Sequence, residues 1–150
     1  MSTRATIVAA VAAATMACAQ EDTPIQSSSK VYVADEESGS LSVIDHASRR
    51  RLRVIDLSET TDGVVTRFTL HNVQVAPDGR SVWVTAMPRA EAHGSHGGEL
   101  SEQVVVIDPH RDTILARIPV GAGLHLAHVV LDAASRYAYL SANEANQVLR

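Results

Sequence analysis

The sequence predicts an all-β fold built from a repeated unit of short antiparallel strands. The first observation is that a segment at 103–121, made of an apolar run, an Asp-led turn and a strand-like stretch, recurs upstream at 42–57. The second is that the apolar runs are about four residues long and mostly β-branched, which favours strands over a core helix. The third is that turn-forming residues separate successive runs.

The downstream copy of the repeat shows its design most clearly. Residues 104–107 are all apolar and predict a strand that is buried on both faces. The chain then turns at Asp108, and residues 113–120 form the partner strand. When Asp45 is aligned with Asp108, the upstream copy has the same order of strand, turn and strand. Each aspartate is expected to accept backbone N–H bonds in its own turn, not to belong to a catalytic pair.

Further strands complete the repeated units. The first unit also contains an alternating strand at 30–34 and a turn at 35–40, and a polar connector at 58–63 is expected to follow it. The turn at 132–136 lacks the Pro-Asp-Gly pattern found at 77–79, so its geometry stays open. The remaining predicted strands lie at 71–76, 81–85, 128–131, 137–141 and 147–150.

Four short antiparallel strands in a unit of roughly forty residues are typical of the blades of a β-propeller. With the strands lettered a to d from the central channel outward, the first unit begins at strand b and the last stops within strand c. We therefore expect an incomplete amino-terminal arc of about three blades, at 30–57, 68–120 and 124–150, the last one truncated. The missing blades are expected in a larger protein.

Short segments of the repeats also resemble those of a known family. These segments are Val31-Tyr32-Val33-Ala34-Asp35, Ser42-Val43-Ile44-Asp45, Ala76-Pro77-Asp78-Gly79-Arg80 and Ile118-Pro119-Val120-Gly121. In these residues the chain resembles the YVTN-type β-propeller repeats of exported bacterial and archaeal proteins. The resemblance covers residues 30–150 and implies the propeller fold. It implies no single activity, because such propellers serve as binding scaffolds, cofactor housings and occasionally enzymes.

The amino terminus has the pattern of a signal peptide. A basic end at Arg4 precedes an apolar run at 7–14, which is far too short to span a bilayer. We therefore expect a signal peptide at 1–19, a polar tether at 20–29, and export to the periplasm. Ordinary cleavage between small residues and lipidation of Cys18, the only cysteine, are alternatives. Lipidation would attach the protein to a membrane as a lipoprotein.

The composition argues against two classes of function. The chain has 150 residues, with 13 Lys and Arg, 17 Asp and Glu, a net charge of -4 and 3% aromatic residues. It lacks the basic balance and the stacking side chains of nucleic-acid-binding proteins, so nucleic acid is not an expected partner. No Gly-x-Ser-x-Gly motif is present and Cys18 lies in the leader, so nucleophilic catalysis has no support.

Most of the histidines are predicted to lie on one face of the ring. In an antiparallel blade, strand a starts at the face where the loop between strands b and c also lies. This face would therefore collect the histidines near the starts of two strands a and those of the insertion at 88–100. His46 and His110 fall in turns on the opposite face. The predicted group is His71, His93, His96, His125 and His128.

The histidine group has two interpretations, a metal site and a purely structural role. Imidazole is a common ligand for copper and zinc, and the glycines beside His93 and His96 would let the insertion fold over an ion. Residue parity places the side chains of His125 and His128 on opposite sides of their strand. An alternative is that the histidines only hydrogen-bond neighbouring blades and that the insertion is a surface loop.

The sequence thus favours an exported binding scaffold that presents one loop-rich face to a protein, a small molecule or a metal. No catalytic residue is predicted. The alternative function is a redox or hydrolytic enzyme whose metal or cofactor lies at the mouth of the channel, close to His71, His125 and His128. Copper and zinc are the metals considered, and the ligand and the number of blades stay open.

Overall fold

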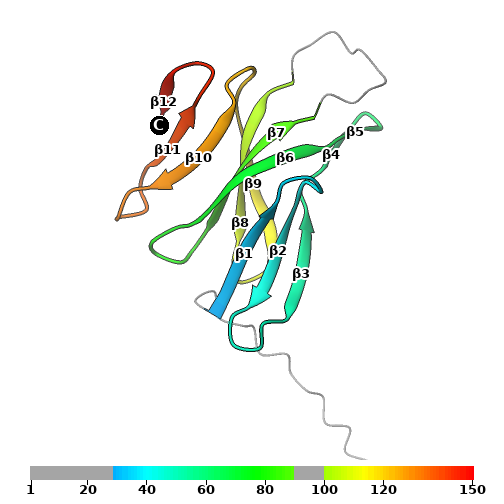
Figure 1. The fold of residues 1–150 in the computed structure, drawn as a ribbon, viewed down its shortest axis with the longest axis vertical. Helices are drawn as coiled ribbons and strands as arrows, with labels where there is room; N and C mark the ends of the chain where they lie inside the picture. Colours follow the sequence, from blue (N-terminus) through cyan, green and yellow to red (C-terminus); the bar gives the residue numbers. More distant parts are fainter. Residues whose placement is uncertain (1–28, 90–99) are drawn as a thin grey trace, which may run out of the picture.

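The structure, a computed structural model, describes residues 29–89 and 100–150. These residues form strands β1 to β12, arranged as one four-stranded sheet, two three-stranded sheets and a two-stranded hairpin (Figure 1). No helix in the described part of the chain is long and apolar enough to cross a membrane. The all-β prediction is confirmed, and the three larger sheets are blades of a β-propeller.

Blade 1 is the sheet β1-β2-β3, formed by Lys30–Asp35, Ser40–Asp45 and Arg51–Asp56. Both of its pairings are antiparallel. These strands take positions b, c and d of the predicted blade. The alternating residues of β1 and β2 send one row of side chains toward the next blade, and Leu41 and Val43 of that row are fully buried.

Blade 2 is the four-stranded sheet β6-β7-β8-β9, formed by Phe68–Val75, Val82–Pro88, Glu102–Asp108 and Thr113–Gly121. Every residue of β8 is buried, whereas every residue of β9 is exposed or half-buried. The apolar run that the sequence predicts to be buried on both faces is therefore the central strand of the molecule. Strand a is longer than expected, because β6 begins at Phe68 rather than at His71.

Blade 3 is the sheet β10-β11-β12, formed by Leu126–Leu131, Ala138–Ala142 and Gln147–Leu149. Its strands take positions a, b and c, so it lacks the outer strand of blade 2 within the described residues. Leu126 and Val129 of β10 and Ala142 of β11 are almost completely buried against blade 2.

The segment expected as a polar connector forms a hairpin instead. β4 (Glu59–Thr61) and β5 (Val64–Thr66) pair antiparallel, with Thr61 opposite Val64. The two residues between the strands, Asp62 and Gly63, have positive φ angles of 51° and 79°. An Asp-Gly pair with both φ angles positive makes the tight turn that matches the twist of a two-stranded ribbon, so this segment pairs with itself although its residues are polar.

Each blade has two faces, and blade 2 is packed on both of them. We call the face toward the preceding blade the N-side face and the face toward the following blade the C-side face. On β8, Val105 and Ile107 point from the N-side face into the core shared with blade 1, while Val104 points from the C-side face into the core shared with blade 3. The first core also holds Tyr32, Leu41, Val43, Ile55, Leu57, Phe68, Leu70, Val82, Val84 and Ala86, and the second holds Ala76, Leu126, Val129, Leu131, Leu140 and Ala142.

The aspartates that lead two turns act as the sequence predicts. Asp45 accepts hydrogen bonds from the backbone N–H and the hydroxyl of Ser48, which hold the pKa of Asp45 below its ordinary value. Asp108 accepts from the backbone N–H of His110 at 2.7 Å and from Nη1 of Arg111 at 2.9 Å. Burial pushes the pKa of Asp108 upward, but these bonds more than offset it and leave the pKa below its ordinary value.

The turn at 132–136 has the same geometry as the Pro-Asp-Gly turn of blade 2. In blade 2 the backbone N–H of Ala76 donates to the carbonyl of Ser81, and in blade 3 that of Asp132 donates to the carbonyl of Tyr137, both at 2.9 Å. The left-handed position is taken by Gly79 (φ 70°) in the first turn and by Ser135 (φ 55°) in the second. The missing glycine therefore does not change the turn.

A buried ion pair joins blades 1 and 2 on the side of the turn that follows β8. Nζ of Lys30 lies 2.9 Å from Oδ1 of Asp112 and donates to the carbonyl of Pro109 at 2.8 Å. The two side chains are only 4% and 11% exposed. Burial, and then the nearby Asp112, raise the pKa of Tyr32 above its ordinary value. The first strand of the arc is thus tied to blade 2 by polar contacts as well as by the core.

Candidate functional site

The candidate site lies on the face where strands a begin, which we call the rim. The rim carries the starts of β6 and β10, the β1–β2 turn and the β11–β12 turn (Figure 1). His46 and His110 lie in the β2–β3 and β8–β9 turns, at the other ends of the same strands. The strand order therefore separates these two histidines from the rim, as the sequence predicts.

Two of the predicted rim histidines are in contact. The ring centroids of His71, in β6, and His125, just before β10, are 5.2 Å apart, and the ring planes are inclined by 60° in an edge-to-face arrangement. The pair joins blade 2 to blade 3. His71 has a side chain that is 28% exposed and His125 one that is 40% exposed, so both imidazoles are open to a ligand from solvent.

A carboxylate lies beside each imidazole. Oε1 of Glu36, in the β1–β2 turn, is 3.9 Å from Nε2 of His71, and Oε1 of Glu144, in the β11–β12 turn, is 3.7 Å from Nδ1 of His125. Arg89 fixes the backbone of Glu36, because its Nη2 donates to the Glu36 carbonyl at 2.8 Å. Side chains from all three blades therefore meet in one cluster.

Glu102 holds the backbone of His125 in place. Its carboxylate accepts from the backbone N–H groups of Leu124, His125 and Leu126, at 2.7, 2.8 and 2.7 Å. His125 has a positive φ of 52°, which turns these successive N–H groups toward one acceptor. Glu102 is 6% exposed and belongs to β8, so the backbone of His125 is hydrogen-bonded to a strand that is buried along its whole length.

A β-bulge positions His71. The pairing of β6 with β7 shifts between Leu70 and Val73, so that two residues of β6, His71 and Asn72, lie opposite Thr85. The backbone N–H of Asn72 donates to Oγ1 of Thr85 at 3.1 Å. The Asn72 side chain then reaches blade 3, where its Oδ1 accepts from the backbone N–H of Val129 at 3.0 Å.

Blade 3 repeats this bulge and places His128 differently from the other histidines. The pairing of β10 shifts between Leu126 and Val129, and the N–H of His128 donates to Oγ of Ser141 at 3.1 Å. His128 therefore takes the position that Asn72 has in blade 2. The bulge breaks the alternation behind the parity prediction, since Leu126 and Val129 both enter the same core. No ring contact in the described part of the chain involves His128.

Three of the predicted functional residues, His93, His96 and Cys18, lie outside the described residues. Within 29–89 and 100–150, no group of three or more His, Cys, Asp and Glu side chains is arranged to hold a metal ion. The described residues thus supply an imidazole pair with two neighbouring carboxylates, and further ligands would have to come from elsewhere.

Two shallow cavities border the cluster and the hairpin. One of about 300 Å³ lies beside the β11–β12 turn that carries Glu144, lined by Ala142, Asn143, Asn146, Gln147 and Val148. The other, of about 380 Å³, lies between the end of β3, the β1–β2 turn and the β4–β5 hairpin, and its charged lining residues are Asp56 and Arg67. Neither cavity is lined by His71 or His125.

The sequence predicts that His71 and His125 lie on the same face, but it does not single out the carboxylates beside them. The strand-direction argument that placed His71 and His125 on the rim also applies to the β1–β2 and β11–β12 turns, and it could have identified Glu36 and Glu144. Glu102 gave no such signal, because an acidic residue before an apolar run is ordinarily read as a solvated strand end.

Solved structures share the fold of this chain. Hydrazine synthase from Kuenenia stuttgartiensis is 22% identical, with a TM-score of 0.56, over 73% of this chain and 31% of that one. A protein from Lactobacillus plantarum is 16% identical, with a TM-score of 0.54, over 80% of this chain and 33% of that one. The chain therefore spans about a third of the length of these structures. At such identities the likeness shows the fold alone.

No protein-family model matches the chain, and no curated protein matches it.

Proposed function

We propose that the chain belongs to an exported β-propeller of the YVTN-repeat type that acts as a binding scaffold and presents its rim to a ligand. The observation that supports this proposal is the contact between His71 and His125, with Glu36 and Glu144 beside them. Residues from three blades converge there, and a propeller offers its loops at such a face for binding.

The ligand that best fits the imidazole pair is a copper or zinc ion. An ion about 2.0–2.1 Å from one nitrogen of each of two histidines, at a tetrahedral angle, brings the ring centroids to roughly 5 Å of one another. The observed separation is 5.2 Å. The spacing of the two rings thus matches that of histidines that share an ion, and rotation about their side-chain bonds would have to turn one nitrogen of each ring toward it, because the rings meet edge to face.

The carboxylates lie near one nitrogen of each ring but do not accept a hydrogen bond from it. Oε1 of Glu36 is 3.9 Å from Nε2 of His71 and Oε1 of Glu144 is 3.7 Å from Nδ1 of His125, so each pair would have to close before the carboxylate could hold that N–H and leave the other nitrogen for the ion. Carboxylates that accept the second N–H of a metal-binding histidine orient the ring and strengthen the ligand. Two imidazoles leave a four-coordinate ion short of ligands. We propose His93 and His96 of the insertion as the missing ones, with His128 as the alternative.

Titration calorimetry with Cu(II) and Zn(II) tests the proposal. His71→Ala, His125→Ala and the double variant His93→Ala/His96→Ala are each expected to weaken binding by roughly tenfold or more, since each loses a ligand. His110→Ala, on the opposite face, is the matched control and should bind as the wild type does. His128→Ala shows whether that residue contributes.

The outcomes separate the possible ligands. Binding that is lost only in the His93/His96 variant would mean a chelate confined to the insertion, and an absence of binding would remove the metal ion and leave a protein or a small molecule as the ligand. Turnover of a reductant by the metal-loaded protein would favour the redox enzyme over the scaffold.

Export is a separate part of the proposal. It is supported by the short apolar run and the small residues at 17–19. Mass spectrometry of the mature amino terminus tests it. A diacylglyceryl group on Cys18 would identify a lipoprotein, a free terminus after cleavage would identify a soluble periplasmic protein, and a chain that retains Met1 would contradict export.

A further inference from the structure

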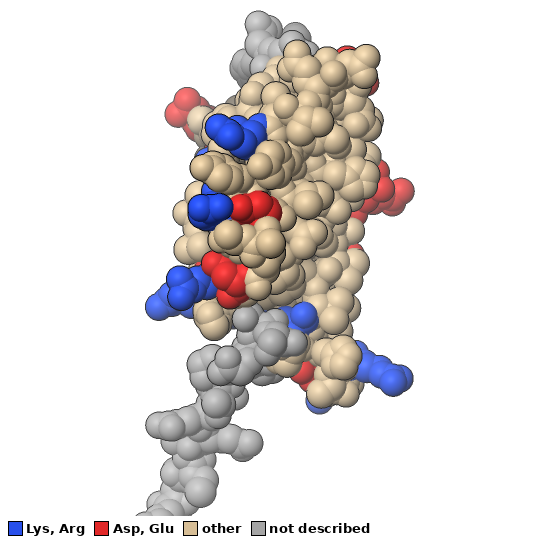
Figure 2. All heavy atoms as spheres, turned by 90° about the vertical axis from the view of Figure 1, so that its left-hand side faces the viewer, with Lys and Arg blue, Asp and Glu red and all other residues tan. Residues whose placement is uncertain are grey.

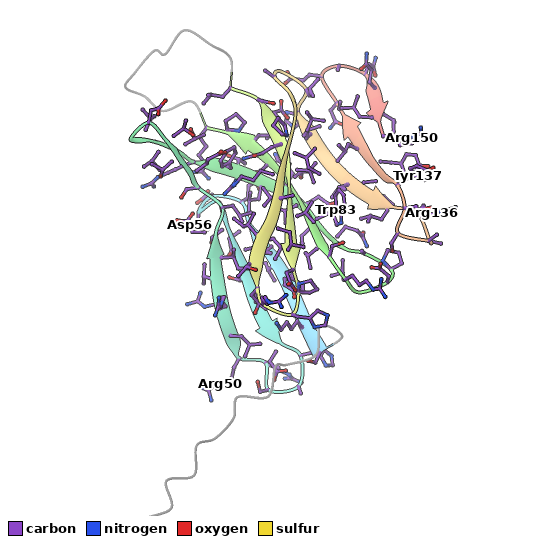
Figure 3. The ribbon with its side chains drawn as sticks, turned by 180° about the vertical axis from the view of Figure 1, so that it is seen from behind. Arg50, Asp56, Trp83, Arg136, Tyr137 and Arg150 are labelled. Atoms are coloured by element: carbon purple, nitrogen blue, oxygen red, sulfur yellow. The ribbon has the colours of Figure 1, made fainter. Side chains whose placement is uncertain are left out.

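The turn between β2 and β3 carries three consecutive arginines, and we call residues 45–51 the arginine turn. Arg49, Arg50 and Arg51 are exposed, and none of them forms an ion pair with another described residue. The carboxylate of Asp45 is occupied by hydrogen bonds within the turn. Figure 3 shows Arg50 at the lower tip of the ribbon. The positive charge of the turn is therefore open to a partner.

The equivalent turn of blade 2 pairs its charges. There Arg111 forms an ion pair with Asp108, and Asp112 forms one with Lys30. Arg49 takes the position of Asp112, because the backbone N–H of each donates to the carbonyl of the aspartate that leads its turn. Both residues have a positive φ, of 57° and 54°, a conformation that aspartate adopts more readily than arginine. Blade 1 thus has an unpaired basic residue where blade 2 has a paired acidic one.

The chain enters the fold beside the arginine turn. Ser29 is the first described residue, and its carbonyl accepts from the backbone N–H of His46 in this turn at 2.8 Å. Ser29 lies at the end of the expected tether at 20–29, which follows Cys18. At about 3.5 Å per residue, Ser29 can lie at most about 40 Å from Cys18. A chain anchored through Cys18 would therefore keep the arginine turn close to the membrane surface.

The excess of positive charge at this turn is local. The whole chain has a net charge of -4, and the side that carries blade 3 is formed largely by uncharged residues (Figure 2). The rim, at the other ends of the strands, carries Glu36 and Glu144 beside its histidines. Anionic lipid headgroups attract clustered arginines within about 10 Å at ordinary ionic strength. An anionic membrane would attract the arginine turn and repel the carboxylates of the rim.

We infer that the arginine turn docks on the surface of an anionic bilayer and holds the rim away from it. This inference rests on the export and membrane attachment considered above. Planar guanidinium groups donate paired N–H bonds to the phosphates that lipid headgroups carry. In this orientation His71 and His125 face away from the membrane and stay accessible to their ligand.

Flotation with lipid vesicles tests the inference. The chain from Cys18 onward, with its thiol left free, is mixed with vesicles of phosphatidylcholine alone or with phosphatidylglycerol added, at low and at high salt. The wild type should bind the phosphatidylglycerol vesicles, and only at low salt. Arg49→Gln/Arg50→Gln should bind them roughly tenfold more weakly. The matched control, Arg67→Gln/Arg150→Gln, changes the net charge equally and should stay within about twofold of the wild type.

The orientation is measured with bicelles that contain phosphatidylglycerol and a paramagnetic lipid. The NMR signals of the amides at 46–51 should broaden more than those of His71 and His125, because the turn lies nearer the lipid. Since neither measurement needs lipidation of Cys18, both can succeed or fail independently of the mass spectrometry that tests export.

Four results would overturn the inference. They are a wild type that does not prefer phosphatidylglycerol vesicles, a control that loses as much binding as the arginine variant, broadening that is greatest at the rim, and binding to soluble polyglutamate without binding to vesicles. The last result would assign the turn to an acidic protein. Circular dichroism checks the fold of each variant, and Arg50→Gln/Arg51→Gln repeats the comparison, so that one misfolded variant does not decide the outcome.

Discussion

Blade 2 and the two flanking blades are made from the same repeat, yet their equivalent residues have very different surroundings. Val104 of blade 2 is 2% exposed and Val148, its equivalent in blade 3, is 73% exposed. The difference arises from the neighbouring sheets, since the strand position and the residue type are the same. In this architecture the free energy of unfolding therefore resides largely in the contacts between blades, as in other repeat proteins.

The largest effect is expected from the ion pair between blades 1 and 2. Asp112→Asn would leave the Lys30 ammonium buried without its counter-charge, which we expect to lower the free energy of unfolding by about 3–4 kcal/mol. The control is Arg111→Gln in the same turn. The Arg111 side chain is 79% exposed, so its loss should cost at most about 1 kcal/mol. Denaturant unfolding measures the free energy of unfolding of both variants. Equal losses would show that burial of the Lys30–Asp112 pair adds nothing to its contribution.

A somewhat smaller effect is expected where the β1–β2 turn meets blade 2. Gly39 has a φ of 68°, and a Cβ atom there would lie 2.4 Å from the Phe68 carbonyl oxygen. Gly39→Ala should therefore destabilise the protein by about 3 kcal/mol, because the backbone of β6 has to move. Gly63 has a φ of 79° but no atom within 4 Å, so Gly63→Ala should cost only about 1 kcal/mol. Thermal unfolding compares the two variants. A larger loss of stability in Gly63→Ala than in Gly39→Ala would contradict this prediction.

The equivalent valines test the comparison most directly. Val104→Ala should lower the free energy of unfolding by about 2 kcal/mol, since it leaves a cavity in the core between blades 2 and 3. Val148→Ala should change it by less than about 0.5 kcal/mol. Denaturant unfolding of both variants beside the wild type measures these losses. Equal losses would contradict the comparison, because Val148 is 73% exposed and Val104 is 2% exposed.

The smallest effect concerns the aspartate-led turns. The pKa of Asp108 is lower in the folded protein than its unfolded value of about 3.9, so its carboxylate stabilises the fold fully above that pH. This contribution is lost as the pH falls from about 4 through the lowered pKa. Asp108→Asn should therefore unfold more easily at neutral pH and show a weaker loss of stability in acid. Denaturant midpoints of the wild type and Asp108→Asn, measured across this pH range, provide the check. If both proteins lost stability equally in acid, Asp108 would not contribute to the acid dependence.

The blades could be predicted because the repeat is defined by features that involve residues close together in the sequence. Apolar alternation, the turns led by Asp45 and Asp108, and the strand directions place His71 and His125 on one rim without any knowledge of distances. The hairpin at 59–66 was missed because its strands are short and polar, although Asp62-Gly63 is a strong turn signal.

The bulges could not be predicted from periodicity. Alternation assigns each residue of a strand to one face, but each bulge sets two residues opposite one and shifts the register by one. In β6 the two residues are His71 and Asn72, and in β10 they are Ala127 and His128. The hydroxyls of Thr85 and Ser141, which support these bulges, lie on the neighbouring strand, so the cause is far away in sequence. The carboxylates beside the histidines also depend on tertiary packing, and the sequence alone did not single them out.

The carboxylate of Glu102 should slow the exchange of three backbone amide protons on the rim with deuterium from D2O. It holds the amide protons of 124–126, and it belongs to a strand that is buried along its whole length. These protons can exchange only when the carboxylate releases them. They should therefore exchange as slowly as those of the central strand, rather than at the rate of a surface loop. We therefore expect the backbone of His125 to open together with the central strand, although its side chain is 40% exposed.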